Sequence, residues 1–182
     1  IQQFATQVCV PCLQGKQHRS PFPTSTTKAK QVLDLVHSDL QGPMPVPSHQ
    51  NRLYMMTIWD DATQYHWSFA LERKSEAYQT FVDWSKRAEK ATGKSVKTLR
   101  TDNGGEYKSK AFQTYLRQHG ILHQTTIPDT PEQNDKAERG NRTIEEKITC
   151  LLHDSATLVN RGSYWAEAMN YATYLINRTP TS

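Results

Sequence analysis

The chain has 182 residues, a formal net charge of +4 and three cysteines, and this length suits one ordinary domain with a short appendage. The small charge imbalance excludes a highly charged disordered chain, and no run of about 18 apolar residues is present that could span a membrane. The mildly basic balance is compatible with a nucleic-acid partner, whereas the odd number of cysteines and the lack of a visible secretory signal argue against a disulfide-linked secreted protein.

Residues 1–30 differ in composition from the rest of the chain. Cys9 and Cys12 form a Cys-x-x-Cys pair, which could supply half of a tetrahedral zinc site and would need two further ligands. The Pro, Ser and Thr content that follows is typical of an extended linker. We therefore predict that residues 1–30 form a separate segment and that the main domain covers residues 31–182.

The main domain alternates between strand-like and helix-like segments. Short apolar runs predict strands at residues 32–36, 53–59, 65–71, 96–100 and 121–126. Apolar side chains at helical spacing predict helices at residues 77–91, 112–116, from 131 onward and from about 163 onward. The order of three strands, helix, strand, helix, strand and then helices predicts an α/β fold with a mixed sheet.

The long helix that begins at Pro131 has a clear start signal. Thr130 can cap it, Pro131 suits the first helical position, and Gln133 completes a capping box. Cys150 lies within this helix, and we predict that it is a core thiol rather than a functional one.

Three carboxylates stand out by their position. Asp39 and Asp102 each end a predicted strand, where sites gather in α/β sheets, and Glu138 lies on the long helix. Carboxylates in such an arrangement could hold two divalent ions for phosphoryl transfer. By position alone, ordinary solvated charges remain the alternative. Other aspartates compete on the same logic: Asp34, Asp60 and Asp61.

Five short motifs, in order along the chain, resemble the integrases of copia-type long-terminal-repeat retrotransposons. They lie at residues 37–43, 101–107, 131–144, 164–168 and 176–180. Thirty-five residues separate Asp102 from Glu138, which is the spacing that defines the Asp–Asp–35–Glu class. The first motif, His37 to Pro43, makes Asp39 the first carboxylate of this class.

The resemblance implies a fold and an activity. The fold is ribonuclease-H-like, a five-stranded mixed sheet with helices on both faces, and residues 31–182 are the integrase catalytic core. Asp39, Asp102 and Glu138 are the implied catalytic residues and ligands of two Mg²⁺ or Mn²⁺ ions. The implied reaction joins the 3′ ends of element DNA to target DNA, within a homo-oligomer, in the nucleus and in a cytoplasmic particle. Cys9 and Cys12 would end a His-His-Cys-Cys domain, so Zn²⁺ could bind only with residues upstream of the chain.

Polar and basic residues near the predicted site are candidates for DNA contact, because the helix that carries Glu138 must face the substrate. They are Asn103, Lys136, Arg139, Asn141 and Arg142. Two residues, Asp135 and Gly140, depart from the family pattern. Two alternatives therefore stay open, a degenerate or co-opted copy that binds DNA without catalysis, and a nuclease of the same superfamily.

Overall fold

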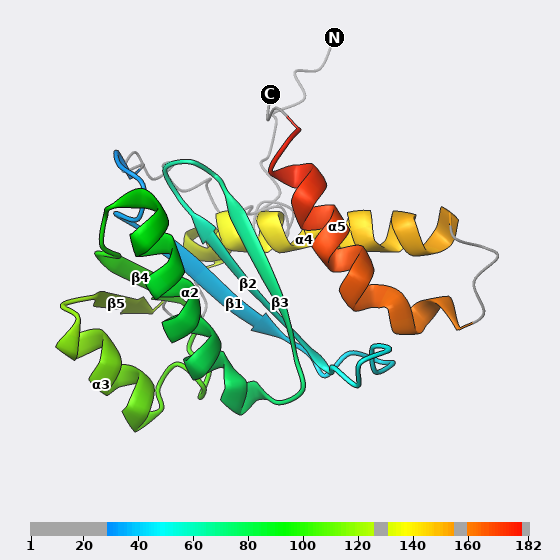
Figure 1. Ribbon diagram of the computed structural model, residues 1–182, viewed down its shortest axis with the longest axis horizontal. Helices are drawn as coiled ribbons and strands as arrows, with labels where there is room; N and C mark the ends of the chain where they lie inside the picture. The colour runs from blue at the N-terminus through cyan, green and yellow to red at the C-terminus, as the bar shows by residue number, and fades with distance from the viewer. Residues whose placement is uncertain (1–28, 126–130, 155–159, 180–182) are drawn as a thin grey trace, which may run out of the picture.

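The computed structural model describes residues 29–125, 131–154 and 160–179, and for residues 131–140 and 154 it describes the backbone only. Its centre is a five-stranded sheet in the order β3-β2-β1-β4-β5 (Figure 1). The strands are β1 (Val36–Gln41), β2 (Tyr54–Asp60), β3 (His66–Leu71), β4 (Thr98–Thr101) and β5 (Leu122–Thr125). The first three strands pair antiparallel, while β4 pairs parallel with both β1 and β5, so the predicted mixed sheet is confirmed.

The described helices follow the predicted order. They are η1 (Lys74–Glu76), α2 (Ala77–Thr92), α3 (Lys110–Gln118), α4 (Pro131–Asp154), η2 (Arg161–Tyr164) and α5 (Trp165–Ile176). Gly93 ends α2 in the left-handed conformation (φ 67°), as its sequence position predicts. Thr130, the predicted cap of α4, lies outside the described residues. None of the helices in the described ranges has the length and apolarity needed to cross a membrane.

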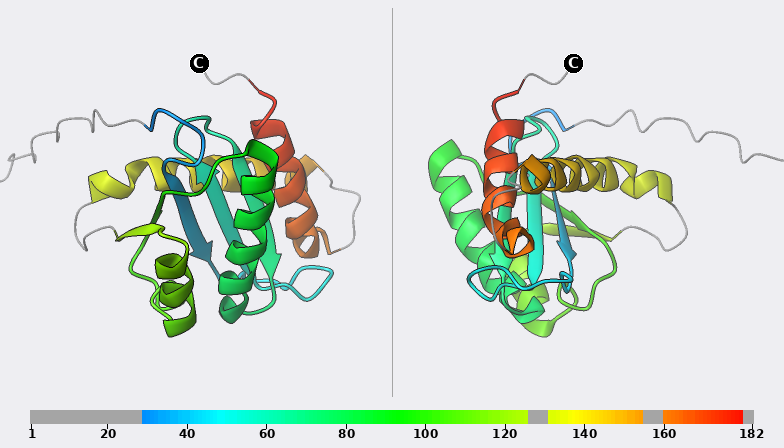
Figure 2. Two further views of the ribbon diagram at one scale, coloured as in Figure 1. Left: turned by 60° about the vertical axis from the view of Figure 1, so that its left-hand side comes forward. Right: turned by 90° about the vertical axis from the view of Figure 1, so that its right-hand side faces the viewer.

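Helices cover both faces of the sheet, as predicted: α2 and α3 lie on one face, and α4 and α5 on the other (Figure 2). Because neighbouring side chains of a strand point to opposite faces, Met56 and Ile58 of β2 pack with α2 and α3, whereas Met55 packs with α4 and α5. Ile144 of α4 and Met169 of α5 are fully buried in that second layer. This layer lies on the face to which Asp39 points.

The predicted strand at residues 32–36 is wrong over residues 32–35, where the chain turns, and only Val36 belongs to β1. Leu33 has a left-handed backbone (φ 66°), its N–H donates to Asp60 Oδ1 at 2.7 Å, and its carbonyl accepts from the Lys97 N–H at 2.9 Å. Since these bonds satisfy the backbone of the turn, β1 begins only at Val36. Asp39 consequently lies within a strand rather than at its end, while Asp102 directly follows β4 as predicted.

The predicted burial of Cys150 is also wrong. Ile144 and Ile148 of α4 are buried, whereas the Cys150 thiol is exposed. A residue two positions after Ile148 is rotated by about 200° around the helix axis, which takes it to the opposite side. Cys150 is therefore a free surface cysteine.

Candidate active site

The pairing of β1 with β4 brings Asp39 and Asp102 together. The two strands run parallel with His37 opposite Arg100. If this register is continued by two residues in each chain segment, Asp39 lies beside Asp102, with both side chains on the face covered by α4. Their charges interact, because the carboxylate of Asp102 contributes to a raised pKa at Asp39. Two of the three predicted carboxylates thus lie side by side.

The environment of Asp39 disfavours a negative charge. Burial is the main cause that raises the pKa of Asp39 to about 6, and the charge of Asp102 adds to it. Hydrogen bonds from Gln41, from the Leu40 backbone and from Asn141 act in the opposite direction without cancelling the effect. A cation between the two carboxylates would offset the cost of burying the negative charge and would reduce the repulsion between the two groups. The carboxylate oxygens are hard donors, and their negative charge is not fully compensated by the protein, so the site fits a divalent metal ion such as Mg²⁺.

Asn141 of α4 lies in the core of the site rather than on its surface. Its side chain is 5% exposed, and its Nδ2 donates to Asp39 Oδ2 at 2.6 Å. Its Oδ1 accepts from the Thr57 hydroxyl of β2 at 2.8 Å. The sequence predicts a DNA contact for Asn141, but both ends of its amide are directed to protein groups. Its geometry favours a role in holding Asp39.

The loop after β4 holds Asp102 by close approach of the backbone. The Gly104 N–H donates to Asp102 Oδ1 at 3.0 Å. A Cβ on Gly104 would lie 2.9 Å from that oxygen and 2.6 Å from Glu106 Oε1, whereas a Cβ on Gly105 would meet nothing within 4 Å. A side chain at position 104 would therefore press on the ends of these two carboxylates, and no left-handed turn requires a glycine there. The presence of Glu106 near Asp102 is a feature that no spacing pattern in the sequence indicated.

Several predicted site residues lie beyond what the structure describes. The backbone of Glu138 belongs to α4, three residues before Asn141, but its side chain is outside the described set. The side chains of Lys136 and Arg139 are outside that set as well, and Cys9 and Cys12 lie outside the described residues altogether. Asn103 and Arg142 are described, and both are exposed. Within the described side chains, which exclude Glu138, no group of three His, Cys, Asp or Glu residues could hold a metal ion.

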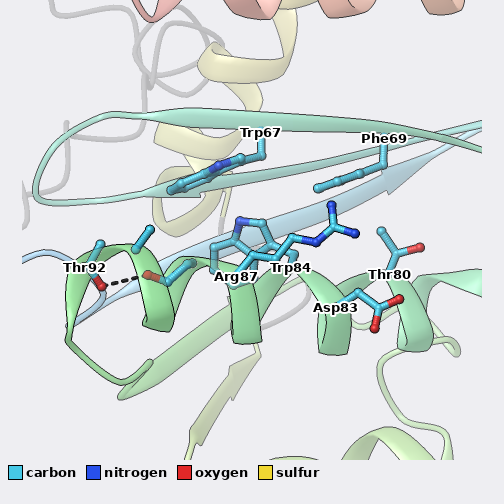
Figure 3. A pocket seen from close by; sticks show the side chains of 9 residues that line it. Trp67, Phe69, Thr80, Asp83, Trp84, Arg87 and Thr92 are labelled. Carbon is cyan, nitrogen blue, oxygen red and sulfur yellow. Dashed lines mark hydrogen bonds between the residues drawn. The ribbon is translucent and has the colours of Figure 1, made fainter.

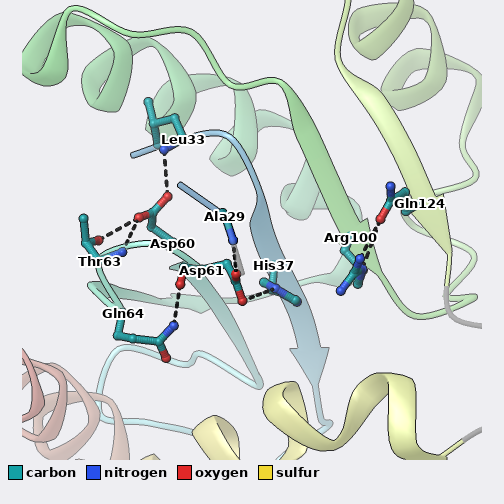
Figure 4. A network of polar contacts seen from close by, with 9 residues as sticks. All are labelled: Ala29, Leu33, His37, Asp60, Asp61, Thr63, Gln64, Arg100 and Gln124. Carbon is teal, nitrogen blue, oxygen red and sulfur yellow. Dashed lines mark hydrogen bonds and ion pairs between the residues drawn. The ribbon is translucent and has the colours of Figure 1, made fainter. Parts of the chain in front are cut away.

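Two of the three competing aspartates, Asp60 and Asp61, have structural partners that Figure 4 shows. Asp60 accepts from the backbone N–H groups of Leu33 and Thr63 and from the Thr63 hydroxyl. Asp61 accepts from the Ala29 N–H at 2.9 Å and lies 3.4 Å from His37 Nε2. These contacts gather around the start of β1 and the turn after β2, and they tie the chain before β1 to the sheet. Asp60 and Asp61 are therefore accounted for by the fold.

Asp34 is the third competing aspartate, and it also has a structural role. It pairs with Lys97 at 2.6 Å and accepts from the Gln31 N–H at 3.0 Å. The hydrogen bond with Lys97 is the main cause that lowers the pKa of Asp34. An aspartate stabilised as an anion by a neighbouring ammonium group needs no metal ion.

A groove of about 440 Å³ lies between β3 and α2 (Figure 3). Its walls include the aromatic rings of Trp67, Phe69 and Trp84, with Arg87 among its lining residues. Trp67 and Phe69 pack with the α2 layer, so the groove lies on the opposite face of the sheet from Asp39. It is separate from the carboxylate pair.

A solved structure shares this architecture. The simian T-cell lymphotropic virus intasome in complex with PP2A regulatory subunit B56 gamma includes a chain that matches 96% of this chain over 59% of its own length. The TM-score is 0.70 and the sequence identity is 20%. At this identity the likeness shows the fold alone. The fold class is therefore the ribonuclease-H-like fold of integrase cores, as the sequence predicts.

The sequence comparisons then identify the family. The family described as Integrase core domain matches residues 29–131, and the chain belongs to it. The chain is 45% identical, over 173 residues and 95% of its length, to the "Retrovirus-related Pol polyprotein from transposon TNT 1-94" of Nicotiana tabacum. It is 37% identical over 174 residues to the corresponding polyproteins from transposons RE2 and RE1 of Arabidopsis thaliana. The predicted resemblance to copia-type elements is thereby confirmed.

These relatives are much longer than the chain. It spans 13% of the tobacco polyprotein and 12% and 11% of the two Arabidopsis polyproteins.

Proposed function

We propose that the chain is an integrase catalytic core that joins the 3′ ends of retrotransposon DNA to target DNA in a divalent-metal-dependent strand transfer. The observation that carries this proposal is the adjacent pair Asp39 and Asp102, of which Asp39 accepts a hydrogen bond from Asn141 on the helix that carries Glu138. Membership of the integrase core family supports the same activity. Glu138 stands three residues before Asn141 in the same helix, and we infer that it completes the carboxylate set.

Asp39, Asp102 and Glu138 are the residues that would hold two Mg²⁺ or Mn²⁺ ions. Such ions activate an attacking hydroxyl and stabilise the leaving oxygen of a phosphodiester. The raised pKa of Asp39 supports the fit, because a cation would offset the burial and repulsion that cause it. Zn²⁺ at Cys9 and Cys12 would need ligands from residues upstream of the chain.

The chain itself supplies orientation and charge. Asn141 holds the carboxylate of Asp39, and the Gly104 N–H holds that of Asp102. Oriented ligands reduce the reorganisation needed as the reaction proceeds. Basic side chains on α4, with the exposed Asn103, would contact DNA phosphates, and binding would then weaken as salt rises. The basic residues are Lys136, Arg139 and Arg142.

The proposed partners are element DNA ends, target DNA and further copies of the same chain. A protein that joins two DNA ends to one target has to bring two active sites together, which suits a symmetric oligomer. Access to target DNA would place the protein in the nucleus, after assembly in a cytoplasmic particle.

The direct test is a strand-transfer assay on a branched DNA substrate that mimics the joined product. It compares the unmodified chain with Glu138→Gln, with Mg²⁺ or Mn²⁺ present. We expect metal-dependent joining that falls below detection in the variant, because the amide lacks the charge of a metal ligand. DNA binding without any joining would point to the degenerate or co-opted copy, and cleavage without joining would point to a nuclease.

Gly104→Ala should reduce this activity while leaving the fold stable. The new Cβ would come within 2.9 Å of Asp102 Oδ1 and 2.6 Å of Glu106 Oε1, so both carboxylates must move. A displacement of a catalytic group by about 1 Å can cost on the order of a hundredfold in rate. We expect a loss of about tenfold to a hundredfold in joining, with a melting temperature close to that of the unmodified chain.

Gly105→Ala is the matched control, because a Cβ there meets nothing within 4 Å. Equal activity in the two variants would contradict the steric explanation.

A further inference from the structure

We infer that Thr57 is a positioning residue for the proposed strand transfer: its hydroxyl fixes the Asn141 amide, which in turn fixes the carboxylate of Asp39 and the helix that carries Glu138. This inference rests on the proposed function. Thr57 does not contact the reacting groups and acts only through Asn141. Thr57 belongs to β2, Asn141 to α4 and Asp39 to β1.

The geometry places the three side chains in one chain of hydrogen bonds. Thr57 is the register partner of Asp39 in the β1–β2 pair, so both side chains point to the face covered by α4. The Thr57 hydroxyl donates to Asn141 Oδ1 at 2.8 Å, and Asn141 Nδ2 donates to Asp39 Oδ2 at 2.6 Å. Thr57 is 1% exposed and Asn141 is 5% exposed. Water is therefore a poor substitute partner for either group.

Hydrogen-bond chemistry gives this chain a direction. An ionised carboxylate can only accept, so the amide must turn its NH₂ group toward Asp39. Its carbonyl oxygen then faces β2, where a donor is required, and the Thr57 hydroxyl is that donor. Without it, the buried carbonyl would be unsatisfied. The amide could then rotate and direct its oxygen at Asp39, which would repel the carboxylate.

The same bonds link two of the proposed metal ligands. Asn141 follows Glu138 by three residues on α4, which is less than one helical turn. The bond from Thr57 anchors Asn141 to β2. It therefore fixes the position, relative to β1 and Asp39, of the part of α4 that carries Glu138. Partners one step removed from a metal site commonly change metal affinity or activity by about tenfold to a hundredfold when they are lost.

Thr57→Val tests the inference, because valine nearly matches threonine in shape but cannot donate. We expect Thr57→Val to raise the Mn²⁺ concentration for half-maximal thermal stabilisation by about tenfold or more, and to lower joining of the branched substrate similarly. Thr57→Ser keeps the donor, so both values in this variant should stay within about threefold of those of the unmodified chain. If the valine variant does not fold, Thr57→Ala replaces it.

Ser68→Ala is the matched control. Ser68 is the register partner of Thr57 on β3, and its hydroxyl bonds Thr173 of α5 at 2.7 Å rather than Asn141. Loss of the Ser68 hydroxyl should change the melting temperature without changing the Mn²⁺ concentration for half-maximal stabilisation. A purely structural role for Thr57 would give the same pattern in Thr57→Val, and that result would overturn the inference.

A metal-free measurement separates this inference from the proposed function. The side-chain NH₂ resonances of Asn141 report its hydrogen bonds by NMR without metal or DNA. We expect them to shift or broaden in Thr57→Val and to stay in place in Thr57→Ser and Ser68→Ala. Unchanged resonances in Thr57→Val would refute the positioning role even if the unmodified chain joins DNA. Absence of joining in the unmodified chain would instead count against the proposed function alone.

Discussion

Asp39→Asn is expected to abolish strand transfer and, at the same time, to stabilise the metal-free protein. Activity should fall by about a thousandfold or more, since several kcal/mol of transition-state stabilisation depend on the metal ligands. The variant keeps an acceptor oxygen for Asn141 Nδ2, so the hydrogen bond that orients the side chain can persist. Stability should rise because the substitution removes a buried negative charge next to Asp102.

The sign of the stability change follows from the pKa of Asp39. Its pKa is raised from 3.8 to about 6 in the folded protein, so ionisation opposes folding. The unmodified chain should therefore lose stability as the pH rises from 3.8 to about 6, by up to about 3 kcal/mol. Asp39→Asn should remove this dependence. The measurement is the melting temperature in EDTA across that pH range.

Divalent metal provides the control for this experiment. Mg²⁺ or Mn²⁺ should raise the melting temperature of the unmodified chain at neutral pH and have little effect on Asp39→Asn. Asp102→Asn should also abolish activity with the fold intact. If either variant joined DNA at the unmodified rate, the assignment of the active site would be wrong.

Asp60→Ala is expected to destabilise the fold strongly without involving the active site. The Asp60 side chain is fully buried and accepts from Leu33 N, Thr63 N and Thr63 Oγ1 at 2.7–2.8 Å. Its removal leaves the buried Leu33 N–H without an acceptor and releases the left-handed turn at Leu33. We expect a loss of about 3 kcal/mol in the free energy of unfolding, since each bond to a charged group contributes about 1.5–3 kcal/mol.

Asp34→Ala is the control for the same turn, because Asp34 pairs with Lys97 in a more exposed setting. Urea denaturation of both variants should show a large shift for Asp60→Ala and a small one for Asp34→Ala. Comparable shifts would mean that the turn does not depend on the Asp60 contacts.

Local patterns predicted most of the secondary structure because they record local forces. Apolar residues at helical spacing, followed by Gly93, predict a helix at 77–91, and α2 covers Ala77–Thr92. The turn at Asp60 and Asp61 likewise separates β2 from β3 as predicted. In each case the apolar side chains of the element and the residue at which it ends lie close together in the sequence.

The first strand shows where local patterns fail. Residues 32–36 are mostly apolar, which suits a strand and an irregular buried turn equally well. The turn forms because Asp60, 27 residues away in sequence, accepts a hydrogen bond from the Leu33 N–H. This contact shifts the strand toward the C-terminus and places Asp39 opposite Thr57 in its interior.

By itself, the sequence determined the family, the order of the elements and the three carboxylates that we propose as catalytic, because motif identity and spacing persist in the linear chain. Only the tertiary structure decided that Asp39 and Asp102 lie side by side, that a Cβ on Gly104 would press on the Asp102 carboxylate, and that Asn141 is buried against Asp39. The hydrogen bonds of Asn141 join residues 84 and 102 positions apart. Contacts of this range depend on which residues of the sheet and the helix meet, and no local spacing in the sequence records that.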